Sequence, residues 1–175
     1  MKKVMPSSPA SWKSRLRKEI LAAQRVVLLG VGNISKGDDA AGILCAQELK
    51  KRIGRRAGSR LKILLGYETP ENMTGDIRKF RPNLVLILDA AQGGYKPGTV
   101  FIVGKNLIKD DGVSTHSISL VFLVSYLEET IGGKAIILGI QPLNMGLGDS
   151  ICLPVRKTAE RLSAYLAHVF VYPRV

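Results

Sequence analysis

The sequence contains few cysteines, and their spacing argues against several kinds of site. Its 175 residues include only Cys45 and Cys152, which are far apart in the chain. No CxxC pair is present, which excludes a zinc ribbon and a thioredoxin-type redox site, and two distant cysteines do not form a disulfide framework. We therefore expect two buried, reduced thiols.

Long apolar runs and the motifs of several common enzymes are also absent. The longest apolar stretches, such as LVLIL at 84–88, have the length of a strand and are too short to span a membrane. No apolar segment near the N-terminus is long enough for a secretory signal, so we expect a cytoplasmic protein. The sequence contains no HExxH, GxSxG or GKS/T motif. Ordinary zincins, hydrolases with a nucleophile elbow and P-loop proteins are thereby excluded.

Acidic residues are scarce relative to basic ones. The chain has 14 Asp and Glu against 26 Lys and Arg, a net charge of +12. Much of the positive charge lies in two stretches, 2–25 and 50–62. Such charge can attract an acidic partner or nucleic acid, but Trp12 is the one aromatic residue in these two stretches, and we expect it to be a packing anchor. We expect solvated charge or an acidic protein partner, and no nucleic acid.

Apolar strand patterns alternate with helical patterns along the chain. This alternation predicts an α/β fold with helices on both faces of a mostly parallel sheet. A basic helical N-terminal arm, 1–24, precedes a single α/β domain, 25–175. The expected strands are 25–30, 61–66, 83–90, 99–103 and 134–140. The expected helices run from Ser8 or Ser11 to about Ala23, from Asp38 or Asp39 to about Ile53, from about Glu71 to Phe80, over 116–133, and from about Leu153 to Val169.

Polar residues follow several of these strands. Ligands of open parallel sheets bind beyond the carboxyl ends of the strands, so these residues are expected to meet at one edge. Asp89 is notable because a buried carboxylate without a partner costs several kcal/mol, on the order of the transfer penalty of a polar group. The candidate site residues are Asn33, Asp38, Asp39, Glu71, Asp89, His116 and Gln141.

Two ligand classes compete for this edge. The turn GVGNIS, 30–35, approaches a dinucleotide fingerprint, but Ser35 replaces its third glycine and two carboxylates would oppose a pyrophosphate. Two carboxylates with an imidazole suit a divalent ion such as Zn, Ni, Mn or Fe. Three protein ligands leave coordination positions open, as in a catalytic or transient metal site.

Five ordered blocks carry a resemblance to a known family. LGVGNISKGDDAAG, ETPENM, LILDAAQGG with KPGTV, STHSISL and ILGIQP are similar to the nickel–iron hydrogenase maturation endopeptidases, most nearly the HycI type. The resemblance implies a three-layer α/β/α sandwich with a five-stranded sheet in the order 2-1-3-5-4, strand four antiparallel. It also implies an endopeptidase that removes the C-terminal extension of the hydrogenase large-subunit precursor after nickel has entered it.

The resemblance assigns roles to the candidate residues. Asp39, Asp89 and His116 match the metal-binding positions of the family and are expected to hold or sense nickel delivered in the substrate, for which another divalent metal can substitute. Asp38 is expected to cap the helix and orient Asp39. Asn33, Glu71 and Gln141 are expected to bind substrate backbone or shape the cleft.

Several alternatives stay open at this stage. The ion can be a catalyst or only a recognition signal, and the protein can be a non-catalytic escort of the precursor or, less favoured, a nucleotide-binding domain. The arm 1–24 precedes the usual start of the family. It can pack on the body, mediate dimers, or dock on the precursor or on a nickel chaperone.

Overall fold

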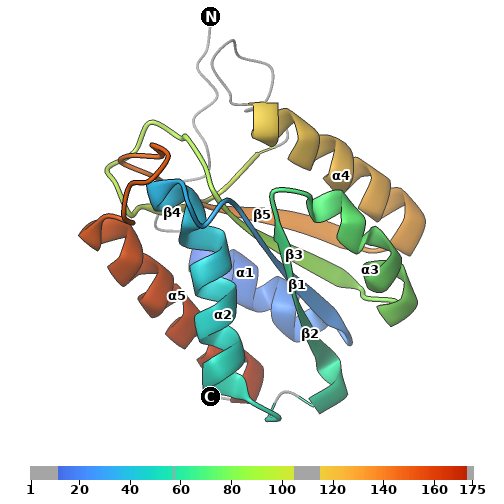
Figure 1. Ribbon diagram of the computed structural model, residues 1–175. Helices are drawn as coiled ribbons and strands as arrows, with labels where there is room; N and C mark the ends of the chain where they lie inside the picture. The colour runs from blue at the N-terminus through green and yellow to red at the C-terminus, as the bar shows by residue number, and fades with distance from the viewer. Residues whose placement is uncertain (1–11, 57, 105–114, 173–175) are drawn as a thin grey trace, which may run out of the picture.

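The computed structural model describes residues 12–56, 58–104 and 115–172. Within these residues a five-stranded sheet has the order β2-β1-β3-β5-β4 (Figure 1). All neighbouring pairs are parallel except β4 and β5, which are antiparallel. The expected strand order and the reversed strand are therefore confirmed. The strands are β1 Val26–Val31, β2 Leu61–Tyr67, β3 Leu84–Ala90, β4 Val100–Ile102 and β5 Lys134–Ile140.

Helices cover both faces of the sheet, which gives the expected three layers (Figure 1). Side chains of α1, α2 and α5 share one buried cluster, and those of α3 and α4 share the other. The helices are α1 Trp12–Ala22, α2 Ala41–Ile53, α3 Thr74–Phe80, α4 Thr115–Ile131 and α5 Leu153–Val171. Short 3-10 segments are η1 Gly37–Ala40, η2 Gly58–Arg60 and η3 Pro70–Met73. No helix among these residues is long and apolar enough to cross a membrane.

The apolar runs of the central strands follow from burial on both faces. Successive side chains of a strand point to opposite faces of the sheet. In β3, Leu86 and Leu88 join the cluster of α1, α2 and α5, whereas Val85 and Ile87 join that of α3 and α4. Both faces of β3 are buried, so side chains on either face have to be apolar. Asp89 is the exception, and it lies at the carboxyl end of the strand.

The described part of the N-terminal arm belongs to the core. Leu16 and Ile20 are fully buried, and Trp12 makes an edge-on contact with Tyr165 at 5.5 Å between ring centroids. Because these apolar positions recur at helical spacing, α1 places them all against α5 and the sheet. Packing on the body is thus the role that residues 12–22 show, and residues 1–11 lie outside the described residues.

Helix α2 approaches the sheet closely because of a glycine. A Cβ atom on Gly42 would lie 2.2 Å from the Leu88 carbonyl oxygen and 2.5 Å from that of Val31. The missing side chain lets the first turn of α2 rest directly on the backbone of β1 and β3. This contact brings the residues just before α2 to the end of β3.

Replacing this glycine tests the contact. Gly42→Ala is expected to lower the free energy of unfolding by about 2 kcal/mol or more, because the added methyl group overpacks a backbone contact. The matched control is Gly75→Ala in α3, where an added Cβ meets nothing within 4 Å. Alanine there should be neutral or stabilising by less than about 1 kcal/mol. Urea unfolding of both variants measures the difference, and equal stabilities would refute the close-packing account.

Candidate functional site

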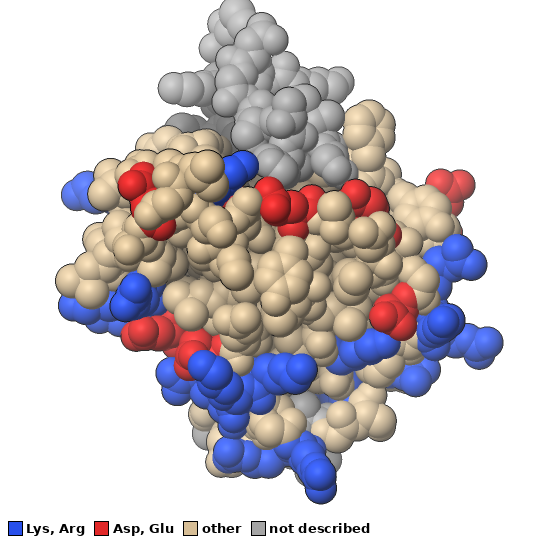
Figure 2. Space-filling view, viewed as in Figure 1, with Lys and Arg blue, Asp and Glu red and all other residues tan. Residues whose placement is uncertain are grey.

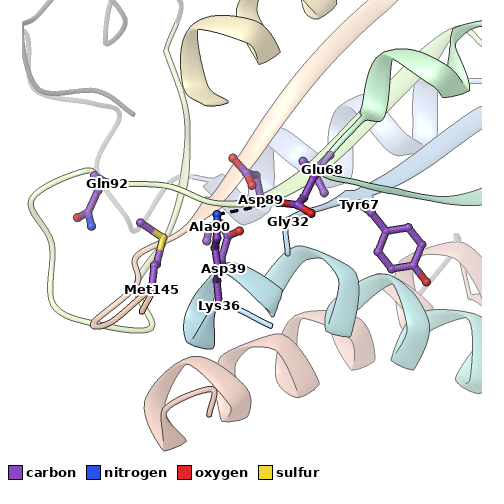
Figure 3. A pocket seen from close by; sticks show the side chains of 10 residues that line it. Gly32, Lys36, Asp39, Tyr67, Glu68, Asp89, Ala90, Gln92 and Met145 are labelled. Atoms are coloured by element: carbon purple, nitrogen blue, oxygen red, sulfur yellow. Dashed lines mark ion pairs between the residues drawn. The ribbon is translucent and has the colours of Figure 1, made fainter. Parts of the chain in front are cut away.

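A small cleft lies at the carboxyl ends of β1, β2 and β3. Its volume is about 150 Å³. Figure 3 shows Asp39 and Asp89 between Gln92 and Met145 on one side and Glu68 and Tyr67 on the other. The described residues that line the cleft are Val31, Gly32, Lys36, Asp39, Tyr67, Glu68, Asp89, Ala90, Gln92 and Met145.

Asp39 is fixed by the turn that follows β1. It lies in η1, immediately before α2, and its Oδ2 accepts a hydrogen bond from the backbone N–H of Asn33 at 2.8 Å. Asp39 thus lies close to the start of α2, where the positive end of the helix dipole attracts negative charge. Gly32 is required at this turn, since its φ is +126° and a Cβ would clash with the Asp39 carbonyl oxygen. The turn therefore holds a half-buried carboxylate toward the cleft.

Asp89 is the buried carboxyl group of the cleft, with 5% of its surface exposed. Burial raises its pKa to about 7, the charge of Asp39 adds to the rise, and a hydrogen bond from the backbone of Ala90 partly offsets it. Among the described residues, no Lys or Arg forms an ion pair with Asp89 or Asp39. Two carboxyl groups thus share one cleft, and none of the described Lys and Arg side chains is paired with either.

The third predicted ligand is placed only by its backbone. His116 lies in the first turn of α4, on the face of the sheet to which Val85 and Ile87 belong. Val85, Ile87 and Asp89 are alternate residues of β3. Asp89 therefore lies on the same face of the sheet as the other two. The side chain of His116 lies outside the described residues. In the part whose side chains are described, no group of three His, Cys, Asp or Glu residues is arranged to hold a metal.

An ion pair spans the mouth of the cleft. Lys36, in the turn after β1, and Glu68, directly after β2, face each other with Nζ and Oε1 4.0 Å apart (Figure 3). Both side chains are substantially exposed, so the pair contributes little to stability. It does place one positive and one negative charge within reach of any ligand that enters.

The expectation that Asp38 caps a helix is wrong. Neither η1 nor α2 has a side-chain cap, and the fully buried Asp38 instead binds the loop between β5 and α5. Its Oδ2 accepts from the N–H groups of Leu143 and Asn144 at 2.7 and 3.0 Å, and its Oδ1 from that of Cys152 at 2.7 Å. Asp38 therefore fastens the 142–152 loop to the turn that carries Asp39.

The thiol of Cys152 is part of this arrangement. Cys152 is half-buried rather than buried as expected, and its Sγ lies 3.1 Å from Asp38 Oδ2. Burial of the Asp38 carboxyl group favours its protonated form, but the backbone hydrogen bonds outweigh this and its pKa is lowered. Asp38 is thus held as an ionised acceptor. Cys45 is buried as expected.

Removing the Asp38 carboxylate should destabilise the protein. Asp38→Ala leaves three backbone N–H groups at a part-buried contact without their acceptor, which we expect to cost about 3 kcal/mol. Asp38→Asn should not restore stability, because an amide group turns one of the two acceptors into a donor. The control is Asp76→Ala, which removes an exposed pair with Lys62 and should change stability by less than about 1 kcal/mol. Thermal unfolding compares all three, and an Asp38→Ala variant as stable as the control would contradict this role.

The other supporting candidates differ in position. Gln141 is buried and organises the loop after β3: its Oε1 accepts from the N–H groups of Gly93 and Tyr95 at 2.8 and 3.2 Å. Asn33 contributes its backbone N–H to Asp39 and uses its side chain to accept from Ser35 N–H at 2.7 Å. Glu71 is exposed in η3 and is not among the residues that line the cleft.

Asp39 and Asp89 are the lining residues that the sequence predicted, and Glu68, Lys36 and Met145 are among those that it did not. Glu68 immediately follows β2, so the rule that placed Asp89 at a strand end would also have selected it. Lys36 precedes the acidic pair and carries the opposite charge, which a search for anionic ligands overlooks. Met145 is an apolar loop residue and offers no sequence signal of its own.

The chain is similar to known proteins in sequence and in fold. The family model for the HycI hydrogenase maturation protease matches residues 43–167. The Hydrogenase 3 maturation protease of Escherichia coli K12 is 35% identical over 135 residues, which are 77% of this chain and 83% of the relative.

Two solved structures have the same fold and clear sequence similarity. The crystal structure of the nickel–iron hydrogenase maturation protease HycI from Thermococcus kodakarensis matches with a TM-score of 0.80 and 33% identity, covering 89% of this chain and 98% of that one. The solution structure of the endopeptidase HycI from Escherichia coli matches with a TM-score of 0.71 and 32% identity, covering 83% and 90%. This chain therefore belongs to the HycI family of hydrogenase maturation proteases.

Proposed function

We propose that this protein is an endopeptidase that removes the C-terminal extension from the nickel-loaded precursor of a nickel–iron hydrogenase large subunit. Membership of the protease family supports the reaction class. The single observation that carries the assignment of the site is the pairing of Asp39 and Asp89 in one cleft at the carboxyl edge of the sheet.

The chemistry of the cleft favours a divalent cation from the substrate. The negative charge of Asp39 helps to raise the pKa of Asp89 to about 7, so the two carboxyl groups are held together at an electrostatic cost. A divalent ion removes this cost, and carboxylate oxygens with an imidazole nitrogen suit nickel. Asp39, Asp89 and His116 would bind the nickel of the precursor. An ion at this place supplies Lewis-acid polarisation of a carbonyl group and lowers the pKa of bound water.

Water is the nucleophile that the lining residues favour. Among the described residues that line the cleft, none is Ser, Thr or Cys. The described lining of the cleft therefore offers no hydroxyl group of Ser or Thr and no thiol that could form a covalent acyl-enzyme. The raised pKa of Asp89, about 7, belongs to the metal-free protein, and binding of nickel would release this proton close to neutral pH. An aspartic-type, nickel-recognising hydrolysis of the peptide bond is consistent with these residues.

A non-catalytic escort is the second candidate. Such a protein would bind the nickel-loaded precursor through the same carboxylates without cutting it. The two functions differ in one product, the released C-terminal peptide.

The test is incubation of the protein with nickel-loaded and nickel-free precursor, followed by intact-mass measurement. We expect the nickel-loaded precursor alone to lose the mass of its C-terminal extension. Equal trimming of both forms would reject nickel recognition but keep the protease. Binding without any mass loss would support the escort instead.

A further inference from the structure

Four large aliphatic side chains are exposed on two loops that hydrogen-bond to each other. They are Ile34 in the turn after β1 and Leu143, Leu147 and Leu153 between β5 and the first residue of α5, with 62%, 65%, 78% and 61% of their surfaces exposed. We call them the aliphatic ridge. A single exposed leucine is common, but a group of exposed apolar side chains on one surface marks an interaction site.

The two loops of the aliphatic ridge are bonded to each other. The N–H of Gly148 donates to the Ser35 carbonyl oxygen at 2.8 Å, and the N–H of Asp38 donates to that of Asn144 at 2.8 Å. The Asp38 carboxylate adds the bonds to Leu143, Asn144 and Cys152 described above. In Figure 1 the orange loop between β5 and α5 accordingly lies beside the start of α2. The ridge is therefore preorganised, and a partner would lose little binding energy in ordering it.

The aliphatic ridge is continuous with the cleft. Met145 stands between Leu143 and Leu147 in the sequence and lines the cleft beside Asp39 and Asp89. The same short loop thus presents one apolar side chain to the cleft and two to solvent. The loop that carries Leu143 and Leu147 therefore adjoins any polypeptide bound in the cleft beside Met145.

Charge does not explain this surface. The ridge residues are uncharged, and Figure 2 shows most Lys and Arg of the visible face in its lower half, around the C-terminal part of α2. The strands end toward the opposite end of the molecule. The four ridge side chains can therefore recognise a partner only through apolar contact.

We propose that the aliphatic ridge binds an apolar stretch of the precursor polypeptide next to the scissile bond. This proposal rests on the proposed function, because it takes the Asp39 and Asp89 cleft as the place of cleavage. A second copy of the chain is the weaker occupant. A stable interface uses about 800 Å² and on the order of 20 residues from each partner, whereas the ridge offers four aliphatic side chains.

The experiment measures steady-state trimming of the nickel-loaded precursor by Leu143→Gln/Leu147→Gln. We expect KM to rise about 10-fold or more while kcat stays within about twofold, because docking side chains of this kind contribute to binding. The matched control is Phe122→Gln, which removes a 73% exposed apolar side chain from α4 and should leave both constants unchanged. Leu147→Gln alone, at the most exposed position of the ridge, should give a smaller rise in KM without affecting folding.

The outcomes separate this proposal from the function on which it rests. Trimming by the wild type together with an unchanged KM in the double variant overturns the docking proposal and leaves the protease intact. A lower kcat at unchanged KM also overturns it. If sedimentation shows a wild-type dimer that the double variant abolishes at unchanged KM, the ridge is a contact between copies and the proposal fails. No trimming by the wild type overturns the proposed function and this proposal with it.

Discussion

Asp39→Asn and Asp89→Asn are each expected to reduce trimming of the nickel-loaded precursor by at least about 100-fold. Substituting groups that only orient metal ligands commonly costs 10- to 100-fold, so losing a ligand should cost at least as much. The fold should survive both changes. Asparagine at 39 keeps an oxygen to accept from Asn33 N–H, and asparagine at 89 is nearly isosteric and removes a buried charge.

The comparison needs an acidic residue outside the cleft. Asp76→Asn changes an exposed carboxylate of α3 that pairs with Lys62, and it should trim at the wild-type rate. The measurement is the rate of precursor loss by mass spectrometry, with circular dichroism to confirm folding. Trimming by either cleft variant within about threefold of wild type would remove that carboxylate from the proposed reaction.

The stability of the free protein should fall as the pH rises from 4 to 8. The pKa of Asp89 is raised from 3.8 to about 7, so the folded state holds this proton more tightly than the unfolded chain does. The resulting stability is fully present below pH 3.8 and is lost as the pH rises through about 7. A change of this size corresponds to about 4 kcal/mol at most.

Asp89→Asn should remove this pH dependence. Urea unfolding in a chelating buffer measures the free energy of unfolding at pH 4 and pH 8. Between pH 4 and pH 8 the free energy of unfolding should fall by several kcal/mol more in the wild type than in the variant, up to about 4 kcal/mol. The variant should be the more stable protein at pH 8. Asp39→Asn should weaken the dependence, since the Asp39 charge contributes to the raised pKa. Parallel pH profiles of wild type and Asp89→Asn would contradict the account.

The layers of the fold were predictable because each central strand is buried on both faces. The strand segments VVLLG and LVLIL contain no polar residue, and segments with a helical pattern separate them. The reversal of β4 was not predictable from this alternation, because three buried residues look alike in either direction. The family resemblance implied the reversal. The antiparallel pairing of β4 with β5, in which Val100 lies opposite Ile140, confirms it.

The position of the two central carboxylates was also predictable. Residues at the carboxyl ends of parallel strands meet at one edge, and Asp39 and Asp89 do line the same cleft. The role of Asp38 was not, since its partners Leu143, Asn144 and Cys152 lie more than 100 residues away in the chain. A local pattern of acid before helix suggested a cap, and a tertiary contact determined the actual bonds. Whether His116 completes the site stays a prediction.

The central claim is that Asp39, Asp89 and His116 share one divalent ion. Anomalous diffraction at the nickel edge, from crystals of the protein grown with Ni²⁺, tests it most directly. The account predicts one strong peak in the cleft, bound by both carboxylates and the imidazole ring. A nickel ion bound elsewhere, or bound in the cleft without Asp39 or Asp89, would contradict it.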